Sequence, residues 1–449
     1  MEKLFGTDGI RGIANQFPLT PDFITRIGSA IGQTLGRDTT HPLALIGRDT
    51  RVSGAMIENA LSAGLMAQGF DTLHVGVLTT PGIAHLTRVL GARCGISISA
   101  SHNPFEDNGI KVFGGDGFKI PDERENEIET LAQSDLSPIT NCQIGTRRDD
   151  TNTVETYVDF VLGAVKRQPI LSGKRVVVDC NNGAASAIAP RALRILGAQV
   201  IALNVQPDGV NINRGYDSLE PKLLRETVLR ERADFGVQFD GDGDRAVFVD
   251  ELGNYVDGDF VLAILARDFK ARGLFAERGN TVVSTVMANI GLEKSLREAG
   301  IAMERTAVGD RWVMERMRAL GAQIGGEQSG HIIFFDGGHT TGDGLYTAIR
   351  LADVITTSGK PLSKLAACMT RYPQVLINVR VPRKPPLDQF PQIQSQVEHS
   401  RSQLGDGARI LLRYSGTENL ARVMIEGCDA ERIAREANAI ADVIRETIT

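Results

Sequence analysis

Hydrophobic positions in the first third of the chain repeat with two periods, one typical of helices and one typical of strands. Apolar residues recur at helical spacing over 21–36, behind a Thr-Pro start and ahead of a glycine, and a second helix is expected over 53–69. Short continuous apolar runs predict buried strands at 43–47, 71–77 and 94–100. Strands that alternate with helices in this way predict a parallel or mixed sheet.

The same pattern starts twice more along the chain. From about residue 151 the sequence predicts strands at 174–180, 199–204 and 234–239, with helices at about 184–196 and 219–232 between them. From about 258 it predicts helices at 258–273, 292–300 and 311–320 and strands at 281–286 and 331–337. Each restart therefore indicates a further α/β unit.

After a helix expected at 343–358 the pattern changes. A proline-rich stretch at 382–392 cannot be regular structure throughout. Strand-like runs at 375–381, 408–414 and 421–427 and an amphipathic helix from Asp429 surround it. We therefore predict an α/β protein, with three consecutive α/β domains of similar element order and a smaller C-terminal α+β domain around a central cleft. The expected boundaries are 1–150, 151–254, 255–370 and 371–449.

Composition narrows the class of protein. A chain of 449 residues with 42% hydrophobic and 23% charged residues is typical of a globular protein. No apolar run reaches the ~20 residues of a membrane span, and the start lacks the regions of a signal peptide, so we expect a cytoplasmic protein. Five scattered cysteines argue against a disulfide framework. The net charge of −6 gives no sign of nucleic-acid binding, so an anionic ligand would need local positive charge.

A serine turn follows the third predicted strand. Ser101 and His102 lie in the stretch ASHNP, where the Asn-Pro pair favours a tight turn, and Lys111 adds a cation ten residues later. Ligand groups tend to lie where strands of α/β sheets end. An ordinary Asx or serine turn is the alternative. The G-x-S-x-G pattern of α/β-hydrolases is absent from the sequence.

Three carboxylates alternate with glycines in the stretch DGDGDR. Asp240, Asp242 and Asp244 lie between two strand-like runs, and glycine lets such a loop wrap around one hard cation. The spacing also resembles an EF-hand, but Arg245 stands where that loop needs glycine and the flanks are strands. Mg²⁺ commonly joins a few carboxylates to a phosphate, and Arg245 suits the same anion.

Two further polar turns offer groups for a sugar phosphate. The stretch GGEQSGH places Glu327 and Ser329 between glycines, ahead of an apolar run. The stretch RYSGTENLAR combines cations, hydroxyls and a glycine that permits a nest of backbone N–H groups, contributed by Arg413, Ser415, Gly416, Thr417 and Arg422. Either stretch is also compatible with an ordinary turn or hairpin.

Together the four stretches suit phosphoryl transfer on a phosphosugar. In their order and their residue sequences they resemble the signature loops of the α-D-phosphohexomutases. The stretches FGTDGIRG and PDGVNIN narrow the resemblance to the bacterial phosphoglucosamine mutases, over residues 4 to about 427. The resemblance implies interconversion of glucosamine 6-phosphate and glucosamine 1-phosphate through a phosphoserine and a 1,6-bisphosphate, a step toward UDP-N-acetylglucosamine.

The resemblance also implies roles for single residues. Ser101 would carry the phosphoryl group and, with the three aspartates, hold one Mg²⁺ per subunit. Arg11 and Lys111 would assist the transfer, with support from His102 and Arg245. Sugar hydroxyls would be bound by Gly309, Glu327 and Ser329. The non-reacting phosphate would be bound by Arg413, Ser415, Gly416 and Thr417. Glucosamine or glucose 1,6-bisphosphate would act as activator.

Some alternatives stay open at this point. The run RGYDSLEP after PDGVNIN departs from the pattern of phosphoglucosamine mutases and leaves sugar preference less certain. A phosphomannomutase/phosphoglucomutase with the same chemistry is the nearest alternative, followed by a phosphatase and by a sugar-phosphate binding protein without turnover. The expected partner is a small phosphosugar, with no nucleic acid and no membrane. The sequence leaves the oligomeric state open, with a homodimer among the options.

Overall fold

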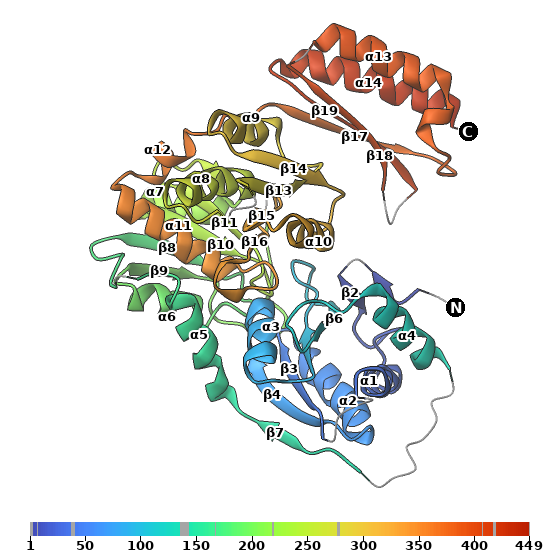
Figure 1. The fold of residues 1–449 in the computed structure, drawn as a ribbon, viewed down its shortest axis with the longest axis vertical. Coiled ribbons are helices and arrows are strands. Elements are labelled where there is room, and N and C mark those ends of the chain that lie inside the picture. The colour runs from blue at the N-terminus through green and yellow to red at the C-terminus, as the bar shows by residue number, and fades with distance from the viewer. Residues whose placement is uncertain are drawn as a thin grey trace. The chain divides into compact units, whose positions relative to one another are not determined.

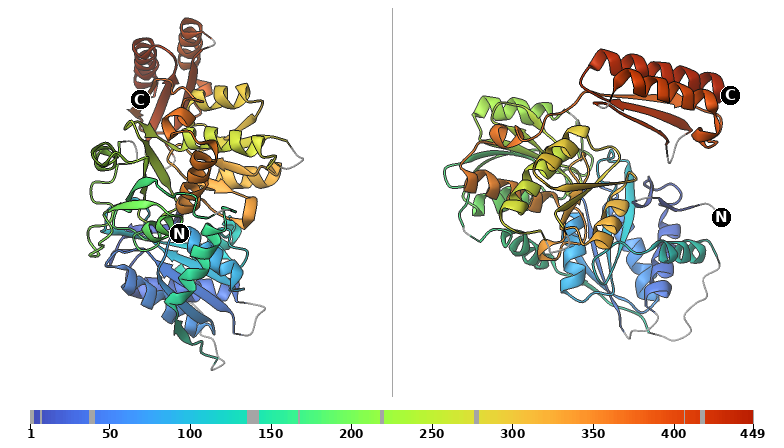
Figure 2. Two further views of the ribbon diagram at one scale, coloured as in Figure 1. Left: turned by 90° about the vertical axis from the view of Figure 1, so that its left-hand side faces the viewer. Right: turned by 45° about the horizontal axis from the view of Figure 1, so that its top comes forward.

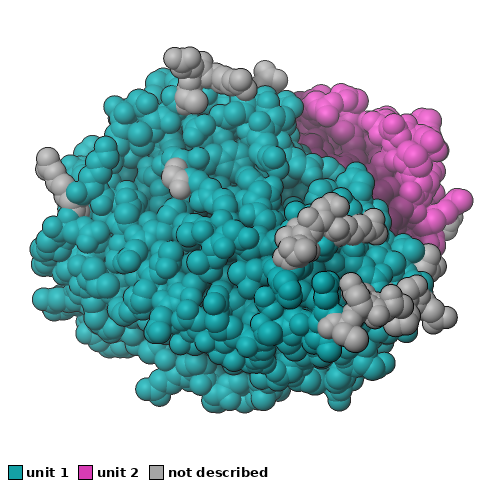
Figure 3. Space-filling view, turned by 60° about the horizontal axis from the view of Figure 1, so that its bottom comes forward, with its two compact units in different colours: residues 1–286, 301–367 teal, residues 287–300, 368–449 magenta. Residues whose placement is uncertain are grey.

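The computed structural model describes most of the chain, which divides into two compact units. The described residues are 3–6, 8–36, 41–134, 143–166, 168–217, 220–275, 279–405, 407–415 and 419–448. Unit 1 comprises residues 1–286 and 301–367, and unit 2 comprises residues 287–300 and 368–449 (Figure 3).

Unit 1 contains three separate sheets (Figure 1). The first has the order β1-β2-β6-β5-β3-β4-β7, the second β12-β11-β10-β8-β9, and the third β14-β13-β15-β16. Their strands are β1 Phe5–Gly6, β2 Gly9–Ile13, β3 Leu43–Arg48, β4 Asp71–Val77, β5 Cys94–Ile98, β6 Asp107–Gly114, β7 Arg147–Asp149, β8 Arg175–Asp179, β9 Gln199–Leu203, β10 Phe235–Phe239, β11 Ala246–Asp250, β12 Tyr255–Val256, β13 Thr281–Thr285, β14 Ala302–Thr306, β15 Ile324–Gly326 and β16 Ile332–Phe334.

Helices connect and cover these sheets. α2 and α3 both pack on β3, and Figure 1 shows them on opposite sides of that strand. The helices of unit 1 are α1 Pro21–Leu35, α2 Gly54–Ala67, α3 Thr80–Val89, α4 Asp122–Gln133, α5 Val154–Leu162, α6 Ala189–Ile195, α7 Lys222–Glu231, α8 Gly258–Ala271, α10 Asp310–Leu320, α11 Gly344–Ser358 and α12 Leu362–Ala366. None of the helices in the described ranges has the length and apolar character needed to cross a membrane.

The three sheets share one arrangement. In each of them a strand runs parallel to one neighbour and turns back into an antiparallel partner on its other side: β5 into β6, β10 into β11, and β15 into β16. Parallel strands next to helical connections are what the repeated βαβ pattern predicts. The predicted fold class, with three α/β domains of similar element order and a smaller fourth domain, is confirmed.

Unit 2 contains a small antiparallel sheet in the order β17-β19-β18, with strands β17 Gln374–Arg380, β19 Leu420–Glu426 and β18 Arg409–Tyr414. Helices α13 Pro391–Leu404 and α14 Ala430–Thr447 lie side by side on one face of it (Figure 2). Their shared core includes Val423 and Ile425 from the central strand and Ile440 from α14. Helix α9 Ile290–Glu298 also belongs to this unit.

Candidate active site

Three of the predicted motifs occupy equivalent places in the fold. The serine turn joins β5 to β6, the aspartate loop joins β10 to β11, and the GEQSGH turn joins β15 to β16. Backbone contacts hold the last two together, because the N–H group of Ala246 donates to Gly330 O at 3.1 Å. A Cβ atom on Gly330 would lie 2.3 Å from the carbonyl oxygen of Ala246, so only glycine fits this approach.

The serine turn presents its hydroxyl to the aspartate loop. Ser101 is fully buried, and its Oγ donates a hydrogen bond to Asp240 Oδ2 at 2.6 Å. Its backbone adopts a left-handed conformation with φ of +52°, which is uncommon for residues other than glycine and asparagine. Ser101 and Asp240 are 139 residues apart in the sequence, yet the fold places them in direct contact.

The three aspartates form a compact cluster. Each offers a carboxylate oxygen within 4.8 Å of the others, and all three side chains are buried. Asp242 Oδ1 and Asp244 Oδ1 accept no hydrogen bond from the described part of the chain. Burial, with repulsion from Asp244 and Asp242, raises the pKa of Asp240 well above its ordinary value. Buried carboxylate oxygens without partners and mutual repulsion both fit a divalent cation held by oxygen ligands.

Lys111 neutralises part of this negative charge. Its Nζ lies 2.8 Å from Asp242 Oδ2, 3.5 Å from Asp244 Oδ2 and 2.9 Å from Asp8 Oδ2. Burial would lower the pKa of Lys111, but these carboxylates raise it well above its ordinary value. The same pairing holds the pKa of Asp242 below its usual range, although burial opposes it. Lys111 is therefore a cation at neutral pH.

Arg11 joins the group from the neighbouring strand β2, where its guanidinium pairs with Asp8 and lies 3.5 Å from Ala100 O. Asp8 thus bridges Arg11, Lys111 and Lys119, whose Nζ is 2.6 Å away. Burial would raise the pKa of Asp8, but the three cations hold it well below its usual range. The basic groups that sequence reasoning expected around Ser101 are thus held in place by a carboxylate.

His102 and Arg245 form a pair beside the serine. Arg245 Nη1 donates to His102 Nδ1 at 2.8 Å, and the same ring nitrogen lies 3.4 Å from Ser101 Oγ. Partial burial and the charge of Arg245 lower the pKa of His102 to about 4. The imidazole is therefore neutral at pH 7, with Nδ1 as an acceptor.

The predicted sugar-binding residues gather at the GEQSGH turn. Glu327 Oε1 accepts a hydrogen bond from Gly309 N at 3.2 Å, at the start of α10. Burial raises the pKa of Glu327. Ser329 lies in the same turn, partly exposed, and His331 follows it with Nε2 3.8 Å from Asp244 Oδ2. This turn therefore brings hydrogen-bonding groups next to the aspartate loop.

The fourth motif lies in unit 2. Arg413 stands opposite Arg422 in the pairing of β18 with β19, and Arg422 Nη2 lies 3.3 Å from Ser415 Oγ. Lys384 Nζ donates to Ser415 O at 2.8 Å. Burial and the charge of Arg422 lower the pKa of Arg413, as expected where cations gather. Gly416 and Thr417 lie outside the described residues.

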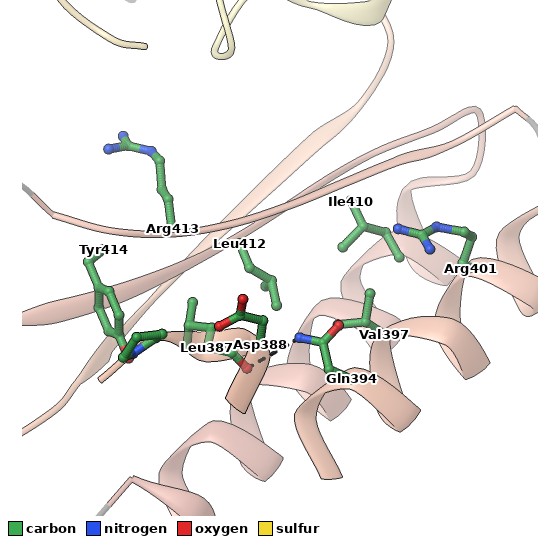
Figure 4. Close-up of a pocket in the computed structure, with 10 residues that line it drawn as sticks. Leu387, Asp388, Gln394, Val397, Arg401, Ile410, Leu412, Arg413 and Tyr414 are labelled. Carbon is green, nitrogen blue, oxygen red and sulfur yellow. Dashed lines mark hydrogen bonds between the residues drawn. The ribbon is translucent and has the colours of Figure 1, made fainter. Parts of the chain in front are cut away.

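Unit 2 also contains a pocket of about 460 Å³. It lies between β18 and α13, and its lining includes Leu387, Val397, Ile410 and Leu412 as well as Arg413. Figure 4 shows the Arg413 guanidinium pointing away from Leu412 and Ile410. The charged end of Arg413 therefore leaves β18 on the side opposite to these apolar side chains.

Sequence reasoning missed several residues of the site. Asp8 lies inside the FGTDGIRG stretch but gave no separate signal, because two of its three cationic partners, Lys111 and Lys119, come from β6 and beyond. Thr80 donates from the start of α3 to Asp242 Oδ2 at 2.7 Å. Lys384 belongs to the proline-rich stretch, where no periodicity marks it. Only the pairing of elements distant in sequence brings these side chains to the motifs.

Comparison with known proteins gives a consistent result. Family models of phosphoglucomutase/phosphomannomutase match residues 2–138 (alpha/beta/alpha domain I), 155–253 (domain II), 257–372 (domain III) and 376–443 (C-terminal domain). Phosphoglucosamine mutase from Geobacter metallireducens is 46% identical over 453 residues, covering 100% of this chain and 99% of the relative. Phosphoglucosamine mutase from Syntrophotalea carbinolica is 48% identical over 450 residues, covering 99% and 97%.

Solved structures show the same fold. A phosphoglucomutase/phosphomannomutase family protein from Burkholderia thailandensis superposes with a TM-score of 0.82 at 24% identity, covering 99% of this chain and 97% of that one. N-acetylphosphoglucosamine mutase from Aspergillus fumigatus, solved in complex with GlcNAc-6P and magnesium, gives a TM-score of 0.67 at 17% identity, with 99% and 96% covered. With four matching domain models and full-length relatives near half identity, the chain belongs to the phosphoglucosamine mutases of the phosphoglucomutase/phosphomannomutase family.

Proposed function

We propose that the protein interconverts glucosamine 6-phosphate and glucosamine 1-phosphate, with Ser101 as the carrier of the transferred phosphoryl group. The observation that carries this proposal is the 2.6 Å contact between Ser101 Oγ and Asp240 within the aspartate cluster. A nucleophilic hydroxyl beside a cation site and a buried lysine is an arrangement suited to phosphoryl transfer. The product would feed synthesis of UDP-N-acetylglucosamine.

Asp240, Asp242 and Asp244 would hold one Mg²⁺, together with an oxygen of phosphorylated Ser101. When bound, this ion supplies positive charge that stabilises the phosphoryl oxygens during transfer. Lys111 would provide a second positive charge from the opposite side of Asp242, and Asp8 would keep both Lys111 and Arg11 in place. The cluster would thus compensate a phosphoserine, which carries about −1.5 to −2 charges.

In the forward half-reaction, the bond between Ser101 Oγ and phosphorus breaks while a sugar hydroxyl forms a bond to the same phosphorus. The hydroxyl loses its proton as the new P–O bond forms, Ser101 Oγ takes up a proton as it leaves phosphorus, and the product is a 1,6-bisphosphate. After the intermediate turns end for end, its other phosphoryl group returns to Ser101. Catalytic amounts of glucosamine or glucose 1,6-bisphosphate would load unphosphorylated Ser101 and act as activator.

The remaining motifs would bind the parts of the sugar phosphate that do not react. Glu327 and Ser329, with the Gly309 loop, would accept and donate hydrogen bonds to hydroxyls. Arg413 and Ser415, with Gly416 and Thr417, would hold the non-reacting phosphate, and Lys384, which donates to Ser415 O, would join them. Arginine suits this task because its planar fork binds phosphate through two hydrogen bonds.

A comparison of three substrates tests the proposal. The purified enzyme, with Mg²⁺ and a trace of glucose 1,6-bisphosphate, is given glucosamine, glucose or mannose 6-phosphate, and 1-phosphate and free phosphate are both measured. We expect glucosamine 6-phosphate to give the highest kcat/KM. Preference for mannose or glucose would refute the sugar assignment, and release of free phosphate in place of 1-phosphate would refute the mutase mechanism.

A further inference from the structure

The backbone of the serine turn directs four carbonyl groups to one place. These oxygens belong to Ser101, Asn103, Pro104 and Asp107, and all four accept hydrogen bonds from the guanidinium of Arg51. Nη2 donates to Ser101 O at 3.0 Å and to Asn103 O at 2.9 Å. Nη1 donates to Asp107 O at 2.9 Å and to Pro104 O. One side chain therefore fixes the whole turn.

Arg51 is itself held rigidly. It is only 1% exposed, and its Nε donates to Asp49 Oδ2 at 2.8 Å. The same Asp49 oxygen accepts a hydrogen bond from Ser99 Oγ at 2.6 Å, and Ser99 Oγ accepts one from Ser101 N at 2.9 Å. Both the N–H and the C=O group of Ser101 are thus tied to the Asp49–Arg51 pair, one directly and one through Ser99.

Asn213, from the PDGVNIN stretch, holds the turn from the other side. Its Nδ2 donates to Ser101 O at 2.7 Å and to Asn103 O at 2.9 Å, while its own N–H donates to Asn181 O at 2.9 Å. The backbone of the aspartate loop closes the arrangement, because a Cβ atom on Gly241 would lie 2.4 Å from Ser101 O. The carbonyl group of Ser101 therefore has donors from two separate segments of unit 1, the one after β3 and the loop between β9 and α7.

These contacts explain how a serine keeps a left-handed backbone with φ of +52°, a conformation that is unfavourable for a residue with a Cβ atom. A buried ion pair contributes little to stability compared with packed apolar side chains of similar size. A left-handed residue held by several converging contacts is typical of functional sites. The contacts converge on the residue whose Oγ meets the aspartate cluster.

We propose that Arg51 and Asn213 are positioning residues for phosphoryl transfer, which hold the Ser101 turn so that Oγ faces the cation site in both half-reactions. This inference rests on the proposed function of Ser101. It gives a role to the PDGVNIN stretch, which narrowed the family resemblance but supplies none of the residues proposed to react. Since both residues contact the backbone of the serine turn and neither belongs to the motifs proposed to bind the sugar phosphate, their loss should lower kcat and leave substrate binding nearly unchanged.

The test uses Asn213→Ala with Asn211→Ala as matched control. Asn211 lies in the same segment and makes hydrogen bonds inside it, to Gln206 O and Asp208 N, but none to the serine turn. We expect Asn213→Ala to lower kcat about ten- to a hundredfold, the range that an ångström-scale misplacement produces, with KM within about twofold. Asn211→Ala should retain the activity of the wild type.

A spectroscopic measurement separates positioning from loss of stability. The ³¹P resonance of phosphorylated Ser101, recorded in full-length enzyme without substrate, should move or broaden in Asn213→Ala and stay unchanged in Asn211→Ala. Arg51→Lys keeps the charge but loses the fork, and a folded Arg51→Lys protein should resemble Asn213→Ala. If Arg51→Lys does not fold, Asn213→Ala alone decides.

The inference is overturned if folded Asn213→Ala has the wild-type kcat, or if kcat falls while the phosphoserine resonance is unchanged. Because that resonance is recorded without substrate, the inference can be tested even if another hexose phosphate proves to be the substrate. Absence of any phosphoserine resonance in active wild-type enzyme would instead refute the proposed function of Ser101.

Discussion

Replacing Asp242 by asparagine removes one charge from the aspartate cluster with little change in shape. In the structure, Asp242 Oδ2 accepts hydrogen bonds from Lys111 Nζ at 2.8 Å and Thr80 Oγ1 at 2.7 Å, while Oδ1 has no partner in the described ranges. The asparagine oxygen should turn toward Lys111 and Thr80, because both are donors. Its NH₂ group would then replace the oxygen that faces the cation.

The effect on folding follows from two opposing charges. At an effective dielectric constant of about 20, the 2.8 Å attraction to Lys111 is worth about 6 kcal/mol, and the repulsion from Asp244, which offers a carboxylate oxygen within 4.8 Å, is worth at least about 3.5 kcal/mol. Repulsion from Asp240 in the same cluster reduces the net cost further. The substitution should therefore cost at most about 2–3 kcal/mol, which a protein of this size tolerates.

The Asp242→Asn substitution should also weaken metal binding. Loss of a residue that only supports a metal ligand typically weakens binding ten- to a hundredfold, so loss of a direct ligand should cost at least about hundredfold, or about 2.7 kcal/mol. We expect the Mg²⁺ concentration for half-maximal activity to rise by at least that factor.

Activity is measured against total Mg²⁺, and binding of Mn²⁺ is measured separately by electron paramagnetic resonance. Asp257→Asn serves as control, because Asp257 is a buried aspartate that caps α8 and asparagine caps a helix equally well. A folded Asp242→Asn protein with wild-type Mg²⁺ requirement and Mn²⁺ affinity would refute the assignment of the cluster as a metal site.

Two further predictions concern the fourth motif, around Arg413 and Ser415, and the pH dependence of stability. Arg413→Ala should lower kcat/KM about ten- to a hundredfold in both reaction directions, because under the proposed function this motif would hold either phosphate in turn and each would lose a charge-assisted contact worth about 1.5–3 kcal/mol; impairment of one direction alone would contradict this. His85 stacks on Phe160, with 3.8 Å between the ring centroids. Burial and the charge of Arg88 lower the pKa of His85 to about 4. Since the ordinary pKa is about 6.5, the unfolded chain binds this proton more readily, so the contribution of His85 to stability is full above pH 6.5 and is lost as pH drops toward 4. His85→Phe should remove up to about 2 kcal/mol of that loss, after allowance for partial solvent contact, and equal pH slopes of the unfolding free energy in both proteins would count against the argument.

Much of the fold follows from periodicity. The strand expected at 234–239 is β10 Phe235–Phe239, and the helix expected from Asp429 is α14 Ala430–Thr447, with Asp429 as its N-cap. Helix α13 Pro391–Leu404 was missed, because only two apolar side chains in it, Ile393 and Val397, are buried. Where a helix covers its sheet with so few apolar contacts, the hydrophobic pattern is too weak to reveal it.

The site was predictable where chemistry is concentrated in short stretches. The motifs around Ser101, Asp240 and Glu327 could be read from residue types and glycines, and the structure places all three stretches at equivalent hairpin turns. Arg51 and Asn213 could not be read in this way, since their importance depends on carbonyl groups of a turn that lies 50 and 112 residues away in sequence. Because every residue has a backbone carbonyl group, the sequence does not show which carbonyl groups accept these hydrogen bonds.

The most direct test of the central claim follows one phosphoryl group. Enzyme carrying ³²P-labelled phosphoserine is mixed with a single equivalent of unlabelled glucosamine 6-phosphate, quenched at short times, and analysed for labelled peptide and labelled sugar. We expect the label to start on the peptide containing Ser101, to appear in the bisphosphate within one turnover, and then to be found in glucosamine 1- and 6-phosphates. Label that stays on Ser101 while product forms, or that resides on another peptide, would contradict it.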